Sequence, residues 1–269
     1  MDHESIKLIL ESNATMDLGA KLKDTDFPAI ALPDNYKVSS LEVFQEHRNY
    51  FRAGFSTTHI TSFASYYAGM DSAPVVYVDP SKMTAACIYD IGTIEKPGHC
   101  THASRVELLK APAFREFEHI AGGEITQRRA AEFIEDWAPF INAFDEEGKE
   151  ILAKNLVATI RRITVESLAN VDSSVGNYAQ SKSAIQSVEA KSSAGSLPAV
   201  IVLTVVPYAG LPEYEFNFRM TIKTEDSIGL IFRRIREEED SEKIADSFVE
   251  VLKGLLPEDS GFLQGIYSS

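Results

Sequence analysis

The clearest helical pattern in the chain runs over residues 124–141, which also hold the single tryptophan, Trp137. Its apolar residues recur at the spacing that lines one face of an α-helix, and they are Ala130, Phe133, Ile134, Trp137 and Ile141. Thr126 suits the N-cap, and Pro139 ends or kinks the helix near Trp137, because the residue before a proline avoids helical geometry. We expect a structural hub around Phe133, Ile134 and Trp137 that docks on a β-sheet.

A second pattern, of period two, predicts the strands of that sheet. Residues 214–223 alternate strictly between apolar and polar side chains, which is typical of an antiparallel strand with one buried face. Runs rich in apolar and β-branched residues predict further strands at 75–79, 83–91, 104–109, 199–206 and 228–235. The run at 199–206 is expected to be buried on both faces, because it lacks the alternation.

Three further helices are predicted by apolar stripes that follow a capping residue. Thr57 or Thr58 precedes the first stripe, Asp145 the second and Ser241 the third. The apolar positions are Ile60, Phe63, Ala64 and Tyr67; Leu152, Leu156 and Ile160; and Ile244, Phe248, Val251, Leu252 and Leu255. The short segment that holds Phe114 and Phe117 mixes polar and apolar residues, and no element is assigned to it.

The strands come in runs rather than alternating with helices, which favours an α+β fold. We predict a mainly antiparallel sheet with packing helices, an N-terminal helical arm and a C-terminal helix. The expected organisation is an arm at 1–30, a single α+β domain at 31–256 and a tail at 257–269. A subdivision near 145–163 would split the domain in two. An arm of this kind, together with exposed strand edges, would suit a homo-oligomer.

The formal net charge of −14 over 269 residues narrows the classes of partner. It argues against a general binder of nucleic acid or of anionic membranes, which would carry a surplus of Lys and Arg. It suits a protein that presents carboxylates to a basic partner. The two cysteines, Cys87 and Cys100, are too few for a disulfide framework. We find no signal-peptide pattern and no apolar run long enough to span a bilayer. These features predict a cytoplasmic protein without a membrane partner.

Several segments, taken in the order in which they occur along the chain, resemble those of a known family. They are LPDNYKVSSLE (32–42), YFRAGFSTTHITSFASYY (50–67), VVYVDP (75–80), PGHCTHASRVEL (97–108), QRRAAEFIEDW (127–137) and IFRRIREEEDSEKIADSFVEVL (231–252). In this order the chain resembles the YfdQ family of uncharacterised phage and prophage proteins over residues 30–255. Gln127 and residues 131–136 match the family's helix, and His102 matches its glycine-tryptophan-x-x-histidine stretch, where His99 replaces the tryptophan. The resemblance implies a phage or prophage setting in the cytoplasm of a bacterial host cell, and no activity.

One cluster, His99, Cys100 and His102, holds side chains that ligate metals, and Cys87 lies upstream. A structural zinc site usually shows two pairs of ligands, whereas this is a single crowded cluster. A metal site at His99, Cys100 and His102 is therefore one interpretation. The alternative is a loop whose histidines make ordinary hydrogen bonds, with Cys87 as a buried, inert residue. A Cys100 nucleophile with a histidine base would also need an oxyanion hole and an orienting group, and the sequence indicates neither.

A second candidate is the set of carboxylates Glu132, Glu135 and Asp136 on one helix, because such sets sometimes bind Mg²⁺. Arg128 and Arg129 on the same helix favour the alternative, a solvated face with ion pairs between neighbouring turns.

A third candidate is a basic patch formed by Arg233, Arg234 and Arg236 with Arg219 on the neighbouring strand. Arginines hold phosphates, so the patch is a candidate nucleic-acid site. The acidic run at 237–240 follows at once and would cancel most of its field. Nucleic-acid contact here is therefore an alternative rather than the favoured interpretation.

The chain lacks the common nucleotide-binding and hydrolase motifs, and we expect no catalytic residue and no cofactor. Our main hypothesis is a non-enzymatic phage accessory protein that acts through a protein–protein interface, with an acidic surface aimed at a host or phage protein. The second is an accessory factor in phage DNA transactions, such as a single-strand-binding or recombination helper. The third is a metal-dependent enzyme that acts on nucleic acid.

Overall fold

The structure is a computed structural model, and it describes residues 42–70, 74–163, 197–223 and 228–268. The chain divides into two units, Met1–Tyr50 and Phe51–Ser269. Within the first unit, the described residues contain one short 3-10 helix, η1 (Glu42–Phe44). The predicted arm at 1–30 lies outside the described residues, and the predicted domain boundaries stay predictions.

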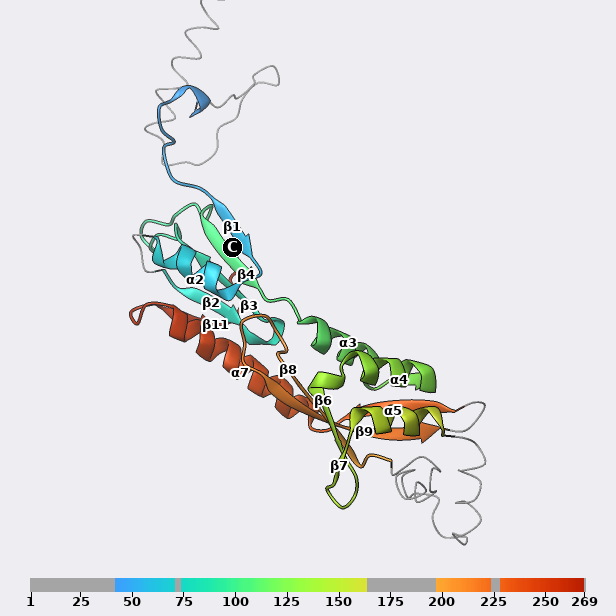
Figure 1. Cartoon of the computed structure of the whole chain (residues 1–269). Coiled ribbons are helices and arrows are strands. Elements are labelled where there is room, and N and C mark those ends of the chain that lie inside the picture. Colours follow the sequence, from blue (N-terminus) through green and yellow to red (C-terminus); the bar gives the residue numbers. More distant parts are fainter. Residues whose placement is uncertain (1–41, 71–73, 164–196, 224–227, 269) are drawn as a thin grey trace, which may run out of the picture. The chain divides into compact units, whose positions relative to one another are not determined.

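The second unit contains two sheets (Figure 1). The first has the strand order β1-β4-β3-β2-β11. Its strands are β1 (Gly54–Thr57), β2 (Val76–Asp79), β3 (Thr84–Ile88), β4 (Ala103–Glu107) and β11 (Phe262–Gln264). The central strands β2, β3 and β4 pair antiparallel, whereas the edge strands β1 and β11 pair parallel to their neighbours. The short 3-10 helix η2 (Pro80–Lys82) joins β2 to β3.

The second sheet has the order β5-β10-β9-β8-β6-β7, and every pair in it is antiparallel. Its strands are β5 (Glu124–Thr126), β6 (Ile141–Phe144), β7 (Glu150–Ile151), β8 (Val200–Val205), β9 (Tyr214–Lys223) and β10 (Gly229–Arg234). The longest strand, β9, coincides with the predicted alternating run. Its even-numbered residues from Phe216 to Ile222 are buried, while its odd-numbered side chains are exposed or half-buried.

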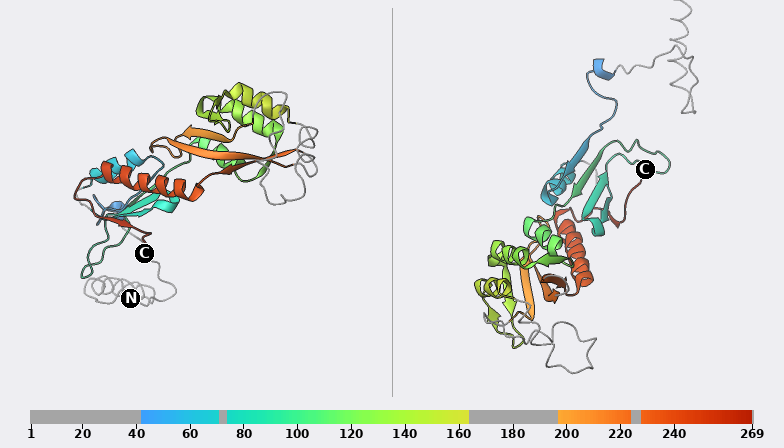
Figure 2. Two further views of the ribbon diagram at one scale, coloured as in Figure 1. Left: turned by 90° about the horizontal axis from the view of Figure 1, so that it is seen from below. Right: turned by 90° about the vertical axis from the view of Figure 1, so that its right-hand side faces the viewer.

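Five α-helices cover these sheets in the described residues. They are α2 (Ile60–Ala68), α3 (Pro112–Ile120), α4 (Gln127–Asp136), α5 (Ala153–Arg161) and α7 (Glu237–Leu255), with the 3-10 helix η3 (Ala138–Phe140) between α4 and β6. Helix α2 packs on the first sheet, and Figures 1 and 2 show α4 and α5 side by side along the orange strands of the second. None of the described helices combines the length and apolar character needed to cross a membrane.

An aromatic layer attaches α3 to β9. The ring centroids of Phe114 and Phe216 lie 4.9 Å apart, and those of Phe117 and Phe218 lie 5.3 Å apart. Three of these four side chains are completely buried, and Phe114 is 2% exposed. Burial of four phenylalanine rings in one layer is a large hydrophobic contribution, so this contact decides which face of the second sheet is covered.

The predicted α+β class with a mainly antiparallel arrangement is confirmed, but several local predictions were wrong. The run at 199–206 forms β8, yet only Ile201, Leu203 and Val205 are buried, because the helix layer covers one face of this sheet. The segment with Phe114 and Phe117 is a helix rather than an unassigned stretch. Ile141 belongs to strand β6 rather than to the helical stripe of α4.

Three predicted helix caps were also wrong. The N-cap of α2 is His59, which makes no side-chain capping hydrogen bond, rather than Thr57 or Thr58. Asp145 closes the turn between β6 and β7, where its Oδ1 accepts hydrogen bonds from the backbone N–H groups of Glu147 and Lys149, at 3.0 and 2.8 Å. Helix α5 begins later, at Ala153. Helix α7 begins one turn before Ser241, because the chain turns sharply at Arg236, whose φ is +56°. The Ser241 hydroxyl instead donates to the carbonyl of Glu237.

Two isoleucines provide a matched test of this core. Ile134 on α4 is completely buried, whereas Ile94 in a loop is fully exposed. We expect Ile134→Ala to lower the free energy of unfolding by about 3 kcal/mol, through lost burial and an unfilled cavity. Ile94→Ala should change it by less than about 0.5 kcal/mol. Urea unfolding followed by circular dichroism measures both, and equal losses would contradict the packing described for α4.

Candidate interaction surfaces

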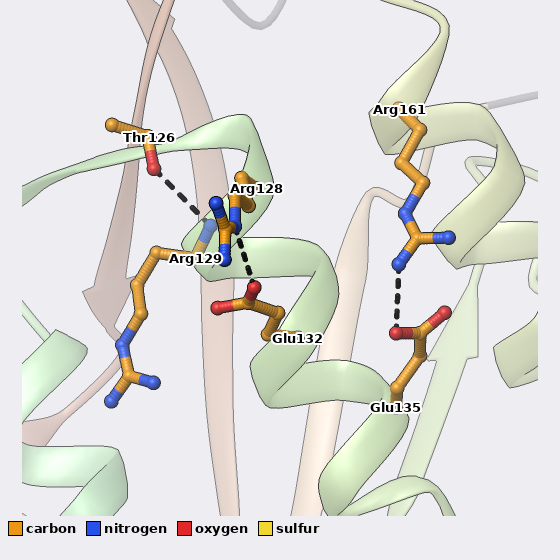
Figure 3. A network of polar contacts seen from close by, with 6 residues as sticks. All are labelled: Thr126, Arg128, Arg129, Glu132, Glu135 and Arg161. Carbon is orange, nitrogen blue, oxygen red and sulfur yellow. Dashed lines mark hydrogen bonds and ion pairs between the residues drawn. The ribbon is translucent and has the colours of Figure 1, made fainter.

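Helix α4 is held at its start by two side-chain contacts. The Thr126 hydroxyl accepts a hydrogen bond from the backbone N–H of Arg129 at 3.2 Å, as the sequence predicted (Figure 3). The Gln127 amide donates to the carbonyl oxygens of Ile160 and Ile163, at 3.0 and 2.7 Å. Ile160 lies in the last turn of α5, and Ile163 lies just beyond its last residue, Arg161. Gln127 therefore ties the start of α4 to the end of α5.

Two of the three carboxylates of α4, Glu132 and Glu135, take part in ion pairs with arginines (Figure 3). Arg128 Nε lies 2.7 Å from Glu132 Oε1 one turn along the helix, and Arg161 Nη2 on α5 lies 2.8 Å from Glu135 Oε2. The Arg128 hydrogen bond holds the pKa of Glu132 below its usual range. These pairs are solvent-exposed and contribute little stability, and they match the expected alternative of a solvated face with ion pairs.

A groove of about 520 Å³ lies between α4 and α5, and we call it the α4–α5 groove. Its apolar lining consists of Ile134, Ala138, Ala153, Val157 and Ala158, and its charged lining of Glu135, Lys154, Arg161 and Arg162. Arg161 is paired with Glu135, whereas Lys154 and Arg162 have no ion-pair partner among the described residues. The groove thus combines an apolar floor with a basic rim.

The residues expected to form the structural hub lie beside this groove. Phe133 and Ile134 are buried, at 1% and 0% exposure. Trp137 ends α4 and is half-buried, with its ring centroid 6.1 Å from that of Phe140. The tryptophan thus sits at the margin of the core, and Phe133 and Ile134 supply the buried contacts of the helix.

His102 lies in an aromatic cluster of the first sheet. Its side chain is 5% exposed, and its Nε2 lies 3.1 Å from the hydroxyl of Tyr66. The rings of Tyr89 and Phe51 are each centred 4.5 Å from the imidazole. The buried imidazole thus has a hydrogen-bond partner and aromatic neighbours, so its burial is explained without a metal ion.

The other members of the predicted metal cluster have different surroundings. Cys100 Sγ lies 3.4 Å from the Tyr267 hydroxyl, and its backbone φ is +53°. Burial raises the pKa of the Cys87 thiol to about 12, which suits an unreactive core residue. Across the described parts of the chain, no three His, Cys, Asp or Glu side chains gather as a metal site would require. The proposed site at His99, Cys100 and His102 stays a prediction that this geometry does not favour.

Asp90 organises the loop that carries these residues. Its carboxylate accepts hydrogen bonds from the backbone N–H groups of Thr101 and His102, at 2.9 and 2.8 Å, and from the Thr101 hydroxyl. Burial opposes ionisation, but the hydrogen bonds from His102 and Thr101 outweigh it and hold the pKa of Asp90 below its usual range. His102 is therefore positioned from its backbone by Asp90 and from its ring by Tyr66.

The predicted basic patch is split by the pleat of the sheet. Arg234 points to the covered face, where its side chain is only 5% exposed and its Nε lies 3.4 Å from Asp240 Oδ2. Its guanidinium lies 4.7 Å from the centre of the Phe216 ring. Burial raises the pKa of Asp240 despite the attraction of Arg234. Arg234 is thus built into the fold and does not face a ligand.

Arg219 and Arg233 come together on the opposite face. They are direct partners across β9 and β10, and both are exposed. Arg236 lies apart at the start of α7, where its Nε is 3.7 Å from Glu239 Oε2. Two of the four predicted arginines therefore form one exposed pair, and the other two are neutralised by acids of α7.

Comparison with known proteins adds one finding. A family model described as an uncharacterised conserved protein, DUF2303, matches residues 3–259. The chain belongs to this family. Neither the curated proteins nor the solved structures contain a match. The match to the DUF2303 family covers nearly the whole chain, and the family's description names no activity.

The α4–α5 groove was missed by the sequence reasoning, although Lys154, Arg161 and Arg162 were visible in the chain. Their spacing on α5 indicated a basic side, but the neighbour that completes the groove, α4, starts far from α5 in sequence. The tertiary structure brings the two helices together, through contacts such as those of Gln127 with Ile160 and of Glu135 with Arg161.

The role of Asp90 leads to a pH-dependent prediction. Asp90→Asn should lower the free energy of unfolding by about 1 kcal/mol near neutral pH, because a charged acceptor is replaced by a neutral one. A carboxyl whose pKa is depressed by folding stabilises the fold above its ordinary pKa of 3.8. This stability is lost as the pH falls through the depressed value. The difference between wild type and Asp90→Asn should therefore shrink in acid, as measured by urea unfolding at a series of pH values.

The control is Asp246→Asn on the exposed side of α7, which should show a small difference at every pH. A wild-type advantage over Asp90→Asn that stays constant down to acid pH would contradict the assigned role.

Proposed function

We propose that this DUF2303 protein is a non-enzymatic phage or prophage accessory protein that acts by binding another protein of the phage or its host. The resemblance of the ordered sequence segments to YfdQ proteins supports the setting. The observation that carries the binding role is the α4–α5 groove, an apolar floor with a basic rim. The bacterial cytoplasm is the compartment that this proposal requires.

The groove suits a segment of a partner protein. Its volume of about 520 Å³ falls in the range of sites that bury a ligand, and its floor offers aliphatic side chains to an apolar anchor. Lys154 and Arg162 supply charge that no described carboxylate neutralises. An amphipathic helix or peptide with apolar anchors and flanking Asp or Glu would complement both features. Its apolar side chains would supply affinity, and its acids would set orientation and rate of association.

An acidic surface for a basic partner, expected from the net charge, remains a second part of the proposal. The first turn of α7 carries Glu237, Glu238, Glu239 and Asp240. Glu239 is paired with Arg236 and Lys243, and Asp240 with Arg234. Glu237 and Glu238 are exposed and have no ion-pair partner among the described residues, so they supply free negative charge at one end of this helix.

A pair of glutamate substitutions on α5 tests the groove. Ala158→Glu places a carboxylate in the groove, whereas Asn155→Glu adds the same charge on the same helix outside it. Tagged wild type and both variants would be used to capture proteins from phage-infected cells, with quantification by mass spectrometry. We expect Ala158→Glu to reduce capture of a discrete partner about tenfold and Asn155→Glu to leave it unchanged.

Circular dichroism would show that both variants are folded. Equal capture by all three proteins would contradict the assignment of the groove. Absence of any captured partner under several conditions would count against a binding protein.

A further inference from the structure

The second sheet has one face that none of the described helices covers. On β9 the covered face carries Phe216 and Phe218, so the residues between and beside them point the other way. Arg219 on β9, Arg233 on β10 and Asn142 on β6 are all exposed on this second side, which we call the open face.

The strand register places four residues of the open face in one row. Arg233 lies opposite Arg219, and Val200 lies opposite Phe144. Ile201 lies opposite Phe218, which brings Val200 beside Arg219. The row therefore reads Phe144, Val200, Arg219, Arg233 across β6, β8, β9 and β10. At the usual strand spacing it is about 14 Å long.

The two arginines of this row are not neutralised by any acid in the described part of the chain. Like charges directly opposite each other on paired strands destabilise a sheet, so this arrangement costs stability in the free protein. No ion pair involves either arginine among the described residues. Nearby Lys223, in contrast, lies 3.5 Å from Glu124, and Arg234 and Arg236 are paired with acids of α7.

Of the acids on the open face, Glu124 stands opposite Ile231 on β10 and is paired with Lys223, and two others lie far from the arginines. Glu150 stands opposite Phe144 at the far end of the row, about 14 Å from Arg219 at normal strand spacing. Glu215 is four residues from Arg219 along β9, which corresponds to about 13 Å. Both separations exceed the distance over which exposed charges interact strongly at physiological salt, about 8 Å. The pair thus keeps a local positive field in a protein of net charge −14.

We propose that the open face binds single-stranded nucleic acid along this row. The paired guanidinium groups hold a phosphate, which also relieves the repulsion between them. Phe144, half-buried at the other end, offers a ring on which a base stacks. The side-chain amides of Asn142 and Asn217 flank the row and supply donors and acceptors for base edges or sugar. Anion sites at one end and an aromatic surface at the other match a strand of nucleotides better than an acidic peptide, which lacks planar bases.

The open face is a different surface from the α4–α5 groove, so this proposal does not rest on the protein-binding role. It also revises the basic patch expected from the sequence. The site consists of Arg219 and Arg233 with Phe144, and it excludes the buried Arg234 and the paired Arg236.

Fluorescence anisotropy with a labelled oligothymidylate of about 20 nucleotides tests the proposal, since single-strand sites span about 4–16 nucleotides. We expect wild-type protein to bind at low salt, with a slope of log K against log salt of about −0.7 for the one phosphate that the arginine pair holds. Arg219→Ala with Arg233→Ala should weaken binding at least about tenfold and remove most of the salt dependence. Phe144→Leu should weaken it about fivefold or more while keeping the slope.

The matched control is Lys96→Ala with Lys149→Ala, two exposed loop lysines whose loss changes the net charge equally. It should retain wild-type affinity. Arg219→Lys with Arg233→Lys keeps the charge and should bind more tightly than the double alanine variant. The double alanine variant should be at least as stable as wild type in thermal unfolding, because a like-charge pair has been removed.

Oligouridylate and a duplex of the same length complete the design. Binding of either single strand supports the open-face site, and their ratio shows whether DNA or RNA is preferred. No wild-type binding at low salt would overturn the proposal, and so would tighter binding of the duplex. Equal losses in the lysine control, or competition by polyglutamate as effective as that by unlabelled oligothymidylate, would also overturn it.

Discussion

The stacking of α3 on β9 through four phenylalanine rings is the contact on which the second sheet depends. Phe114 and Phe117 from the helix meet Phe216 and Phe218 from the strand in a fully buried layer. Because side chains alternate along a strand, this contact also determines which residues of β9 and β10 are left for solvent. A shift of one residue in register would bury Arg219 and expose the phenylalanines, at a large cost in free energy.

The same alternation gives neighbouring arginines opposite roles. Arg233 and Arg234 are adjacent in sequence, yet one is exposed beside Arg219 and the other lies against the Phe216 ring and the Asp240 carboxylate. Arg234 and Asp240 join β10 to α7, so these charges serve the fold. Exposed and unpaired charges such as Arg219 and Arg233 remain available for an external anion, which is why burial and pairing separate structural arginines from candidate binding residues.

Two surfaces with different chemistry therefore exist in one acidic chain. The α4–α5 groove combines aliphatic side chains with Lys154 and Arg162, and the open face combines Phe144 with a pair of arginines. The net charge of −14 is compatible with both, because screening limits exposed charges to a local range. It lowers the affinity of any polyanion, however, and this repulsion is screened as the salt concentration rises. A protein partner and a single strand could occupy these surfaces independently.

Local sequence determined the α+β class, the strand at 214–223 and the helix that Thr126 caps, because hydrophobic periodicity and capping chemistry act within a few residues. Local sequence did not determine the start of α7, because the backbone turn at Arg236 starts the helix before Ser241. It also did not determine the role of Asp145, which closes the tight loop after Phe144 instead of capping a helix. Only the tertiary structure decided the sites. The α4–α5 groove and the row from Phe144 to Arg233 are made from strands and helices distant in sequence, whose pairing depends on burial of the whole core.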